Sequence, residues 1–403
     1  MSECANSTTK IVNTNLKNAN IIVYRAVEGK RLHKIRERRL NMSALSEKEF
    51  KAVLDAFGFK ASGKPFGNGH INDTFIIDGT PKYVLQKINK DVFKNPVALM
   101  DNVASVTEYI TERTKEMGKD TPRCTLHMCK TTDGANVFQA ANGEYYRAYQ
   151  FVDDCDSVDK ADDLKYYYNA AVAIGNFYSI LDGFDASTLT ETIPNFHHTK
   201  KRFENLKAAI AADKMGRAAS VQAEIQFALD RENITSIILD AMQEGSVPVR
   251  VTHNDTKMNN ILFDSETKEP VCLIDLDTVM PGSFLYDYGD FLRFAANTGE
   301  EDDIDLSLVN FDLKVFEAFT KGCLDSMGST LTEKELLLMP ISAAIMTYEC
   351  GIRFLEDHLN GDTYFKIHRE NHNLDRARTQ FKLVADIEKN LDTMLSFIKS
   401  YHN

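Results

Sequence analysis

The sequence predicts an α+β fold of two lobes, with a small five-stranded antiparallel β lobe followed by a larger, mainly helical lobe. Two observations support this prediction. Short segments of strand-forming residues, bounded by glycine, proline and asparagine, crowd between residues 66 and 152, whereas helical periodicity dominates after residue 153. With 403 residues, the chain is long enough to form both lobes.

Residues 1–41 differ from the rest of the chain, being polar at first and then basic through Lys30–Arg39. A basic tail for an anionic surface is one interpretation. We prefer a disordered extension, or a start assigned too early with Met42 as the true first residue. The fold is expected to begin at Ser46, which forms a capping-box pattern with Glu49 before an amphipathic helix.

The N-terminal lobe is expected to span residues 42–152. A glycine turn precedes two short strands, and Asn95-Pro96 opens a helix that runs to about residue 117. Two further strands complete the sheet, and Asp153-Asp154 mark the hinge. The predicted strands cover residues 74–78, 83–88, 137–139 and 144–152.

The C-terminal lobe is expected to span residues 153–403 and to be built mainly from helices. The segment 251–278 should form a β-hairpin within this lobe, and Pro340 should interrupt one helix. The predicted helices cover residues 161–181, 200–211, 221–242, 284–296, 306–323, 333–359 and 375–400.

Composition narrows the classes of function. The net charge of −12 argues against a nucleic-acid partner, because phosphates would be repelled on average. No apolar run approaches the roughly 18 residues of a membrane helix, and the N-terminus lacks the apolar core of a signal peptide. Seven scattered cysteines without a CxxC pair indicate reduced thiols, so we expect a cytoplasmic protein.

The segment 251–278 carries the residues of an ATP- and Mg²⁺-dependent phosphoryl transfer. Asp255 is placed to accept the proton of an attacking hydroxyl, while Asn260 and Asp275 offer oxygen ligands to magnesium. Protein kinases use the same combination of a catalytic-loop Asp, an Asn five residues later and a metal-binding Asp at a strand end. With the predicted lobe order, this motif predicts a protein kinase-like fold.

Neighbouring residues of this segment receive supporting roles. His253 is expected to brace the loop by hydrogen bonding, and Lys257 to reach the γ-phosphate as a second catalytic group. Asp277 is either a further metal contact or a loop brace. Turn formation alone would explain one such motif, but not the combination of loop, spacing and strand-borne Asp.

The glycine turn is the second candidate element. Gly67 and Gly69 would let the backbone approach the ATP phosphates, although a turn of this kind also occurs in ordinary hairpins. Asn72 and Thr74 are candidate phosphate contacts, and His70 could instead face the acceptor.

The third predicted strand leaves the usual kinase lysine uncertain. Gln86 and Lys87 must lie on opposite faces of the sheet, so only one of them enters the cleft. Glu108 on the following helix is the candidate carboxylate partner, with a solvated helix face as the alternative. Phe151 and Val152, at the hinge, complete the candidate nucleotide site.

Several of these strings resemble a known family. The segments at 253–260, 274–277 and 287–290 are similar to the aminoglycoside phosphotransferase and choline kinase-like superfamily. Longer strings at 67–72, 253–260, 274–282, 293–298 and 348–355 resemble the N-acetylhexosamine 1-kinases. The resemblance spans about residue 46 to the C-terminus. It implies transfer of the ATP γ-phosphate to the anomeric hydroxyl of GlcNAc or GalNAc.

The resemblance also implies an acceptor pocket that contains Arg353 and Tyr364, besides His70 and Asp255. Residue chemistry agrees, because Arg353 and Tyr364 can donate hydrogen bonds to a neutral sugar, whereas choline and aminoglycosides need an acidic pocket. The alternative is that Arg353 only pairs with Glu349 one helical turn away. Two rival functions stay open, namely another small-molecule kinase (for homoserine, methylthioribose, choline or an aminoglycoside) and a non-catalytic pseudokinase. The oligomeric state and the GlcNAc or GalNAc preference are not predicted.

Overall fold

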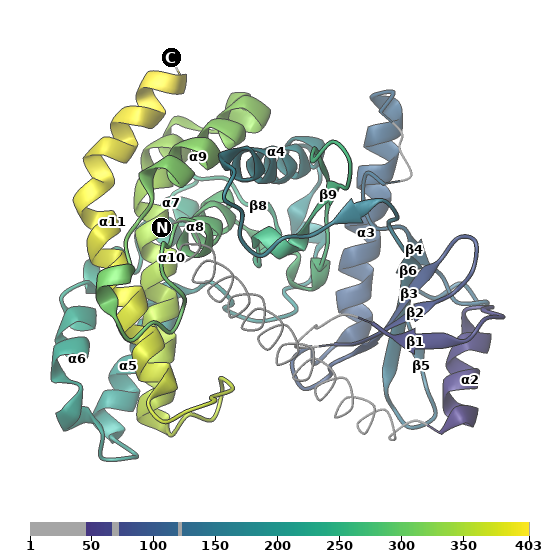
Figure 1. Ribbon diagram of the computed structural model, residues 1–403, viewed down its shortest axis with the longest axis horizontal. Helices are drawn as coiled ribbons and strands as arrows, with labels where there is room; N and C mark the ends of the chain where they lie inside the picture. Colours follow the sequence, from purple (N-terminus) through teal and green to yellow (C-terminus); the bar gives the residue numbers. More distant parts are fainter. Residues whose placement is uncertain (1–45, 67–71, 120–122, 403) are drawn as a thin grey trace, which may run out of the picture.

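The computed structural model describes residues 46–66, 72–119 and 123–402. These residues form a sheet-rich lobe and a larger helical lobe that lie side by side, with α3 standing between the sheet and the rest of the protein (Figure 1). The predicted two-lobe α+β organisation is therefore confirmed. The predictions for residues 1–41 and for Gly67, Gly69 and His70 lie outside the described residues.

The N-terminal lobe is built on one antiparallel sheet. Its strand order is β1-β2-β3-β6-β4, and β5 pairs with β6. The sheet has six strands where five were predicted, and the short strands β1 and β4 lie outside the four predicted strand ranges because they carry no alternating pattern. The elements are α2 (Glu47–Ala56), β1 (Gly63–Pro65), β2 (Asp73–Ile77), β3 (Tyr83–Ile88), α3 (Pro96–Glu116), β4 (Met128–Cys129), β5 (Phe138–Gln139) and β6 (Tyr145–Gln150).

The two faces of this sheet have different partners. One face packs its apolar side chains, such as Phe75, Leu85 and Ala148, against α2 in a small separate core. The capping box of Ser46 and Glu49 starts α2 as predicted. The opposite face presents Gln86 and other polar side chains toward the helical lobe, because successive strand residues alternate between faces.

The helical lobe begins after β6 and surrounds one large apolar core. Its catalytic segment lies on short strands, where β8 pairs with β11 and β9 pairs with both β7 and β10. The elements are β7 (Cys155–Asp156), α4 (Leu164–Ile180), α5 (Thr199–Ala212), α6 (Gln222–Leu229), α7 (Ile237–Gln243), β8 (Arg250–Thr252), β9 (Ile261–Asp264), β10 (Pro270–Leu273), the short 3-10 helix η6 (Leu276–Thr278), β11 (Met280–Gly282), α8 (Phe284–Ala295), α9 (Leu313–Met327), α10 (Glu333–Asn360) and α11 (His372–His402).

Two helix predictions need correction. The expected helix over 221–242 is split into α6 and α7, with a 3-10 turn at Glu232–Ile234 between them. The expected break at Pro340 is absent, because α10 runs through it without interruption. Pro340 lies in the second turn of a helix that packs against α8 and α11, and this burial outweighs one lost backbone hydrogen bond.

Helix α10 also revises the expectation about apolar runs. Within the described ranges it is the one helix long and apolar enough to cross a membrane, judged by length and composition, with a mean hydropathy of 1.3. Of that apolar window, 83% is buried inside the protein. The apolar surface of α10 is therefore covered by neighbouring elements of the same chain.

Candidate active site

The loop that follows β8 is held in place by one buried carboxylate on α8. Asp287 accepts hydrogen bonds from the backbone nitrogens of His253 (2.9 Å) and Asn254 (2.7 Å), and from the hydroxyl of Tyr178 (2.6 Å). The backbone oxygen of Asp287 accepts a further bond from Thr256. Burial raises the pKa of Asp287, and the donors around it act in the opposite direction. Through these contacts Asp287 braces the catalytic loop.

The catalytic loop is also tied to the segment that follows β10. Asn254 adopts a left-handed conformation (φ 65°), and its side-chain amide donates to the backbone oxygens of Thr252 and Thr278. The ring Nε2 of His253 lies 3.0 Å from the backbone oxygen of Ile274. His253 therefore joins the loop carrying Asp255 to the strand end carrying Asp275, in agreement with the predicted bracing role.

Asp255, Lys257 and Asn260 come together at the mouth of this loop. The Nζ atom of Lys257 is 2.9 Å from Oδ2 of Asp255. The side-chain amide of Asn260 donates to the backbone oxygen of Asp255 at 2.9 Å and to its Oδ2 at 3.3 Å. Burial alone would lower the pKa of Lys257, but the nearby carboxylates of Asp255 and Asp275 outweigh it and raise the pKa. Lys257 therefore stays a cation beside Asp255.

Asp275 is the free carboxylate of the site. It follows β10 in a left-handed conformation (φ 61°), and its side chain accepts no hydrogen bond from the part of the chain that the structure describes. Asp275 is exposed by its accessible surface, although many protein atoms lie close to its carboxylate. This crowding, with the charges of Asp277 and Asp255, raises the pKa of Asp275 to about 6. A cation placed beside Asp275 would stabilise the charged form of its carboxylate.

The donor set at this position fits magnesium. Because the amide nitrogen of Asn260 is fixed on Asp255, its carbonyl oxygen remains available, and Asp275 adds carboxylate oxygens. The described residues contain no group of three or more His, Cys, Asp or Glu that could hold a metal. Magnesium needs no such cage, since it usually takes one or two protein oxygens with phosphates and waters.

Both carboxylate oxygens of Asp277 already have protein partners. One carboxylate oxygen pairs with the guanidinium of Arg147, and the other accepts a hydrogen bond from the side chain of Asn72 at 2.7 Å. Both donors come from the N-terminal lobe, so Asp277 links the two lobes. Of the two predicted roles, the contacts favour the brace over the metal ligand, because both oxygens already have partners.

The strand β3 places Gln86, and not Lys87, in the cleft. The Gln86 side chain donates to the hydroxyl of Thr74 at 3.0 Å and accepts from Nε of Arg147 at 2.9 Å. Lys87 lies on the opposite face, 3.5 Å from Glu144. The alternation of strand residues explains this result, because Lys87 shares its face with Leu85, which packs against α2. The prediction that Lys87 contacts the nucleotide is therefore corrected, because its side chain lies on the other face of the sheet.

The expected carboxylate partner on α3 is also corrected. Glu108 is exposed and pairs with Lys130 at 3.2 Å, on the solvated side of the helix. Asn102 of α3 instead bonds to the other lobe, since its side-chain amide donates to the backbone oxygens of Thr190 (2.7 Å) and Val279 (3.0 Å). With no lysine on the cleft face of β3, a carboxylate on α3 has no cation to hold there.

The hinge residues form the outer part of the cleft. The rings of Phe151 and Phe66 meet edge to face at 6.0 Å, and the Lys82 ammonium lies 5.3 Å from the Phe151 ring centroid. Val152 is half-buried beside them. Phe66 is 49% exposed, so its ring is available to a flat ligand.

A buried ion pair between His197 and Glu349 connects the catalytic loop to α10. Glu349 accepts from the hydroxyl of Thr199 (2.6 Å) and lies 3.0 Å from Nδ1 of His197, while Nε2 of His197 lies 3.2 Å from the backbone oxygen of Asn254. Burial would lower the pKa of His197 and raise that of Glu349. Their mutual attraction outweighs burial in both cases, so the pKa of His197 is raised and that of Glu349 lowered.

Because Glu349 is used by His197, Arg353 has a different set of neighbours. The Arg353 guanidinium lies 5.5 Å from the ring centroid of Phe365 and 6.0 Å from that of Tyr364. The structure therefore brings Arg353 and Tyr364 together, as the acceptor prediction requires. The expected alternative of an Arg353–Glu349 pair has no hydrogen bond or ion pair among the described residues. Tyr364 is 72% exposed and so is open to a ligand.

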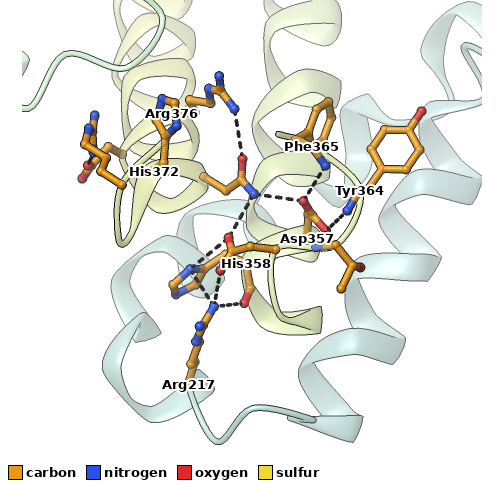
Figure 2. Close-up of polar contacts among 12 residues, drawn as sticks. Arg217, Asp357, His358, Tyr364, Phe365, His372 and Arg376 are labelled. Carbon is orange, nitrogen blue, oxygen red and sulfur yellow. Dashed lines mark hydrogen bonds and ion pairs between the residues drawn. The ribbon is translucent and has the colours of Figure 1, made fainter. Parts of the chain in front are cut away.

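The segment that carries Tyr364 is fixed by one buried carboxylate on α10. Asp357 accepts hydrogen bonds, all of 2.9 Å, from the backbone nitrogens of Thr363, Tyr364 and Phe365 and from the side chain of Asn373 (Figure 2). Burying a carboxylate is tolerated only with such donors. The exposed tyrosine therefore stands on an ordered turn.

Three residues of this site were not predicted, namely Arg147, His197 and Asp357. An arginine in the middle of an apolar strand was a usable signal for Arg147, because strand alternation places it on the same face as Gln86. The partners of His197 lie 57 and 152 residues away in the sequence, and those of Asp357 lie between six and sixteen residues away. No local pattern reveals such contacts.

Comparison with known proteins gives a consistent result. A family model described as the phosphotransferase enzyme family matches residues 62–310. Among solved structures, a microcompartment-associated aminopropanol kinase is 15% identical, with a TM-score of 0.52 over 85% of this chain and 97% of that chain. An amicoumacin kinase in complex with AMP-PNP, Ca²⁺ and Ami is 13% identical, with a TM-score of 0.53 over 87% and 96%.

An aminoglycoside phosphotransferase from Alicyclobacillus acidocaldarius subsp. acidocaldarius DSM 446 is similar to the same extent. It is 10% identical, with a TM-score of 0.53, over 87% of this chain and 95% of that chain. At such identities the likeness is one of fold. The predicted protein kinase-like fold is thereby confirmed.

Proposed function

Because the chain belongs to the phosphotransferase enzyme family, in the aminoglycoside phosphotransferase and choline kinase-like superfamily, we propose that it is an N-acetylhexosamine 1-kinase. It would transfer the γ-phosphate of ATP to the anomeric hydroxyl of GlcNAc or GalNAc. The observation that carries the proposal is the convergence of Asp255, Lys257, Asn260 and Asp275 at one point of the cleft. This is the arrangement that phosphoryl transfer between ATP and a hydroxyl requires.

The nucleotide would lie between the sheet and the catalytic loop. Thr74, Gln86 and Asn72 face this space from the N-terminal lobe, and Phe151 and Val152 border it at the hinge. Asn260 and Asp275 would hold Mg²⁺, which supplies positive charge to the ATP phosphates when bound.

The catalytic residues divide the chemistry between them. Asp255 accepts the proton of the anomeric hydroxyl as that oxygen bonds to the γ-phosphorus and the bond to the bridging oxygen of ADP breaks. Lys257, 2.9 Å from Asp255, holds its ammonium where charge gathers on the transferring group. Asp287 and His253 keep the loop in position without contacting the reactants.

The charges around the acceptor site favour a neutral sugar. Arg353 lies beside Tyr364, and burial together with the nearby positive charge of Arg353 lowers the pKa of Arg202. The buried Glu349 pairs with His197, and the carboxylate of Glu356 lies near the positive charges of Arg202 and Arg353. A pocket for choline or an aminoglycoside would need unpaired carboxylates, whereas arginine and tyrosine donors suit hydroxyl and N-acetyl oxygens.

A panel of acceptors tests this proposal. The protein is incubated with Mg-ATP and one acceptor at a time, and ADP release is measured. We expect turnover with GlcNAc or GalNAc at least about tenfold faster, in kcat/KM, than with homoserine, methylthioribose, choline or an aminoglycoside. Turnover confined to one of those other acceptors would reject the sugar. No turnover with any of them, but measurable ATP binding, would favour the pseudokinase.

The lobe boundary and the cellular location are two further parts of this proposal. We place the lobe boundary between residues 152 and 153, where β6 gives way to the hinge. We also propose a cytoplasmic location, where thiols stay reduced and ATP is supplied. The six described cysteines, which are all free, support this location.

Acidification is expected to weaken metal binding at Asp275. Because its pKa is raised to about 6, the carboxylate is present above that pH and is lost as the pH falls through it. Affinity for Mn²⁺ without nucleotide should therefore fall about tenfold between pH 7 and pH 5, by the ratio of ionised forms. Titration followed by electron paramagnetic resonance measures this. An affinity that stays constant to pH 5 would contradict the assignment.

Removing the anchor of the Tyr364 turn should weaken acceptor binding alone. The change Asp357→Ala leaves three backbone nitrogens without their acceptor, so we expect KM for the sugar to rise about tenfold while KM for ATP stays within twofold. Steady-state kinetics separates the two constants. Glu370→Gln, an exposed change after the same turn, is the matched control. Equal loss in both constants would indicate general damage instead.

A further inference from the structure

The cleft-facing surface of the N-terminal sheet carries a cation on β6, where kinases usually have one on β3. Gln86 occupies the β3 position that faces the cleft, and Lys87 is turned toward Glu144 on the other face. Directly opposite Gln86 in the sheet register stands Arg147 of β6. Cross-strand partners share a face, so the Arg147 side chain enters the cleft where that of Lys87 does not.

The contacts of Arg147 hold its guanidinium at the seam between the lobes. Its Nε donates to Gln86 at 2.9 Å, and its Nη1 pairs with Asp277 and lies 3.8 Å from the sulfur of Met100. These partners fix the plane of the guanidinium, and its side chain is only 5% exposed. A buried cation is costly unless it is paired and hydrogen-bonded, and Asp277 and Gln86 meet that condition for Arg147.

Part of that guanidinium is left without a protein partner. Among the described residues, Nη2 of Arg147 donates to no acceptor, whereas Nε and Nη1 both do. Arg147 also lines a small cavity, and Asp275 and Leu276 line the same cavity from the segment that follows β10. The arginine with a free nitrogen and the carboxylate assigned to the metal therefore border one cavity.

We propose that Arg147 contacts the phosphates of the bound nucleotide, in place of the cation that β3 lacks. This inference rests on the proposed function. A guanidinium suits the task because its planar donors can serve Gln86, Asp277 and a phosphate oxygen at once, which one ammonium group at the end of a flexible stem cannot do with fixed geometry. Asp277 and Gln86 are then positioning residues, which aim Arg147 at the nucleotide.

Binding of AMP-PNP and of adenosine, measured by calorimetry with Mg²⁺ present, tests this proposal without any turnover. For Arg147→Met we expect AMP-PNP affinity to fall at least about thirtyfold and adenosine affinity to change less than threefold. Arg147→Lys keeps the charge for Asp277 but loses the second donor, so AMP-PNP affinity should fall about tenfold. Lys87→Met, on the other face of the same sheet, is the matched control and should bind AMP-PNP within twofold of the wild type.

The outcomes separate this inference from the function it rests on. If Arg147→Lys folds with an unchanged melting temperature and binds AMP-PNP as the wild type does, Arg147 is only a brace between the lobes. Equal losses for AMP-PNP and adenosine would also overturn the proposal, because a phosphate contact must discriminate between them. A wild-type protein that binds no AMP-PNP would overturn the proposed function together with the inference.

Discussion

Replacing Asp255 with Asn is expected to lower kcat about a thousandfold while ATP affinity stays within about threefold. The asparagine keeps the shape of the side chain and can still accept the amide of Asn260, but it cannot take the proton of the acceptor hydroxyl. It also removes the negative partner of Lys257. The loss therefore belongs to the chemical step, and single-turnover kinetics with saturating ATP should show it.

The control for this variant lies beside the same loop. Asp159 is exposed, and its carboxylate accepts a hydrogen bond from Asn259 at 2.9 Å. Asp159→Asn therefore alters one charge near the site without reaching the cleft, and it should keep kcat within twofold. A kcat near the wild-type value for Asp255→Asn would remove Asp255 from the role of base.

Replacing Asp275 with Asn should have an effect of similar size by a different route. The variant loses the one carboxylate of the site that lacks a protein partner, so Mn²⁺ affinity should fall at least about tenfold and kcat about a thousandfold. The pH dependence of metal binding between pH 7 and pH 5 should disappear with it. Titration of Mn²⁺ and steady-state kinetics at saturating metal measure the two effects.

Asp277→Asn is the informative comparison, because it changes the next carboxylate, two residues after Asp275. Both Asp277 oxygens already contact Arg147 and Asn72, so Mn²⁺ affinity should stay within about threefold. If Asp277→Asn weakens Mn²⁺ binding as much as Asp275→Asn does, Asp277 is a ligand and not a brace. If Asp275→Asn binds Mn²⁺ normally, the metal site lies elsewhere.

The parts of the fold that depend on local patterns were predictable. Ser46 and Glu49 mark the start of α2, and Asn95-Pro96 marks that of α3, because capping uses residues close in sequence. Pro340 misled the prediction, since tertiary packing of α10 overrides a local helix breaker. The edge strands β1 and β4 have no pattern of their own and pair only because neighbouring strands are present.

The residues of the candidate site also fall into two groups: those that a local sequence pattern reveals, and those that only the folded chain brings together. The segment 251–278 carries its own spacing, so Asp255, Asn260 and Asp275 could be named from the sequence. The choice between Gln86 and Lys87 could not be made, because it depends on which face of β3 meets α2. The partners of Asp277 and Glu349 come from segments more than 120 residues away, and only the folded chain brings them together.

The most direct test of the central claim is the identity of the product. GlcNAc or GalNAc labelled with ¹³C at C1 is incubated with Mg-ATP and the protein, and the ³¹P spectrum is recorded. We predict a new phosphomonoester resonance that is split by coupling to the labelled carbon, which places phosphate on the anomeric oxygen. A phosphomonoester without that coupling, or conversion of ATP to ADP with no phosphorylated sugar, would contradict the assignment as an N-acetylhexosamine 1-kinase.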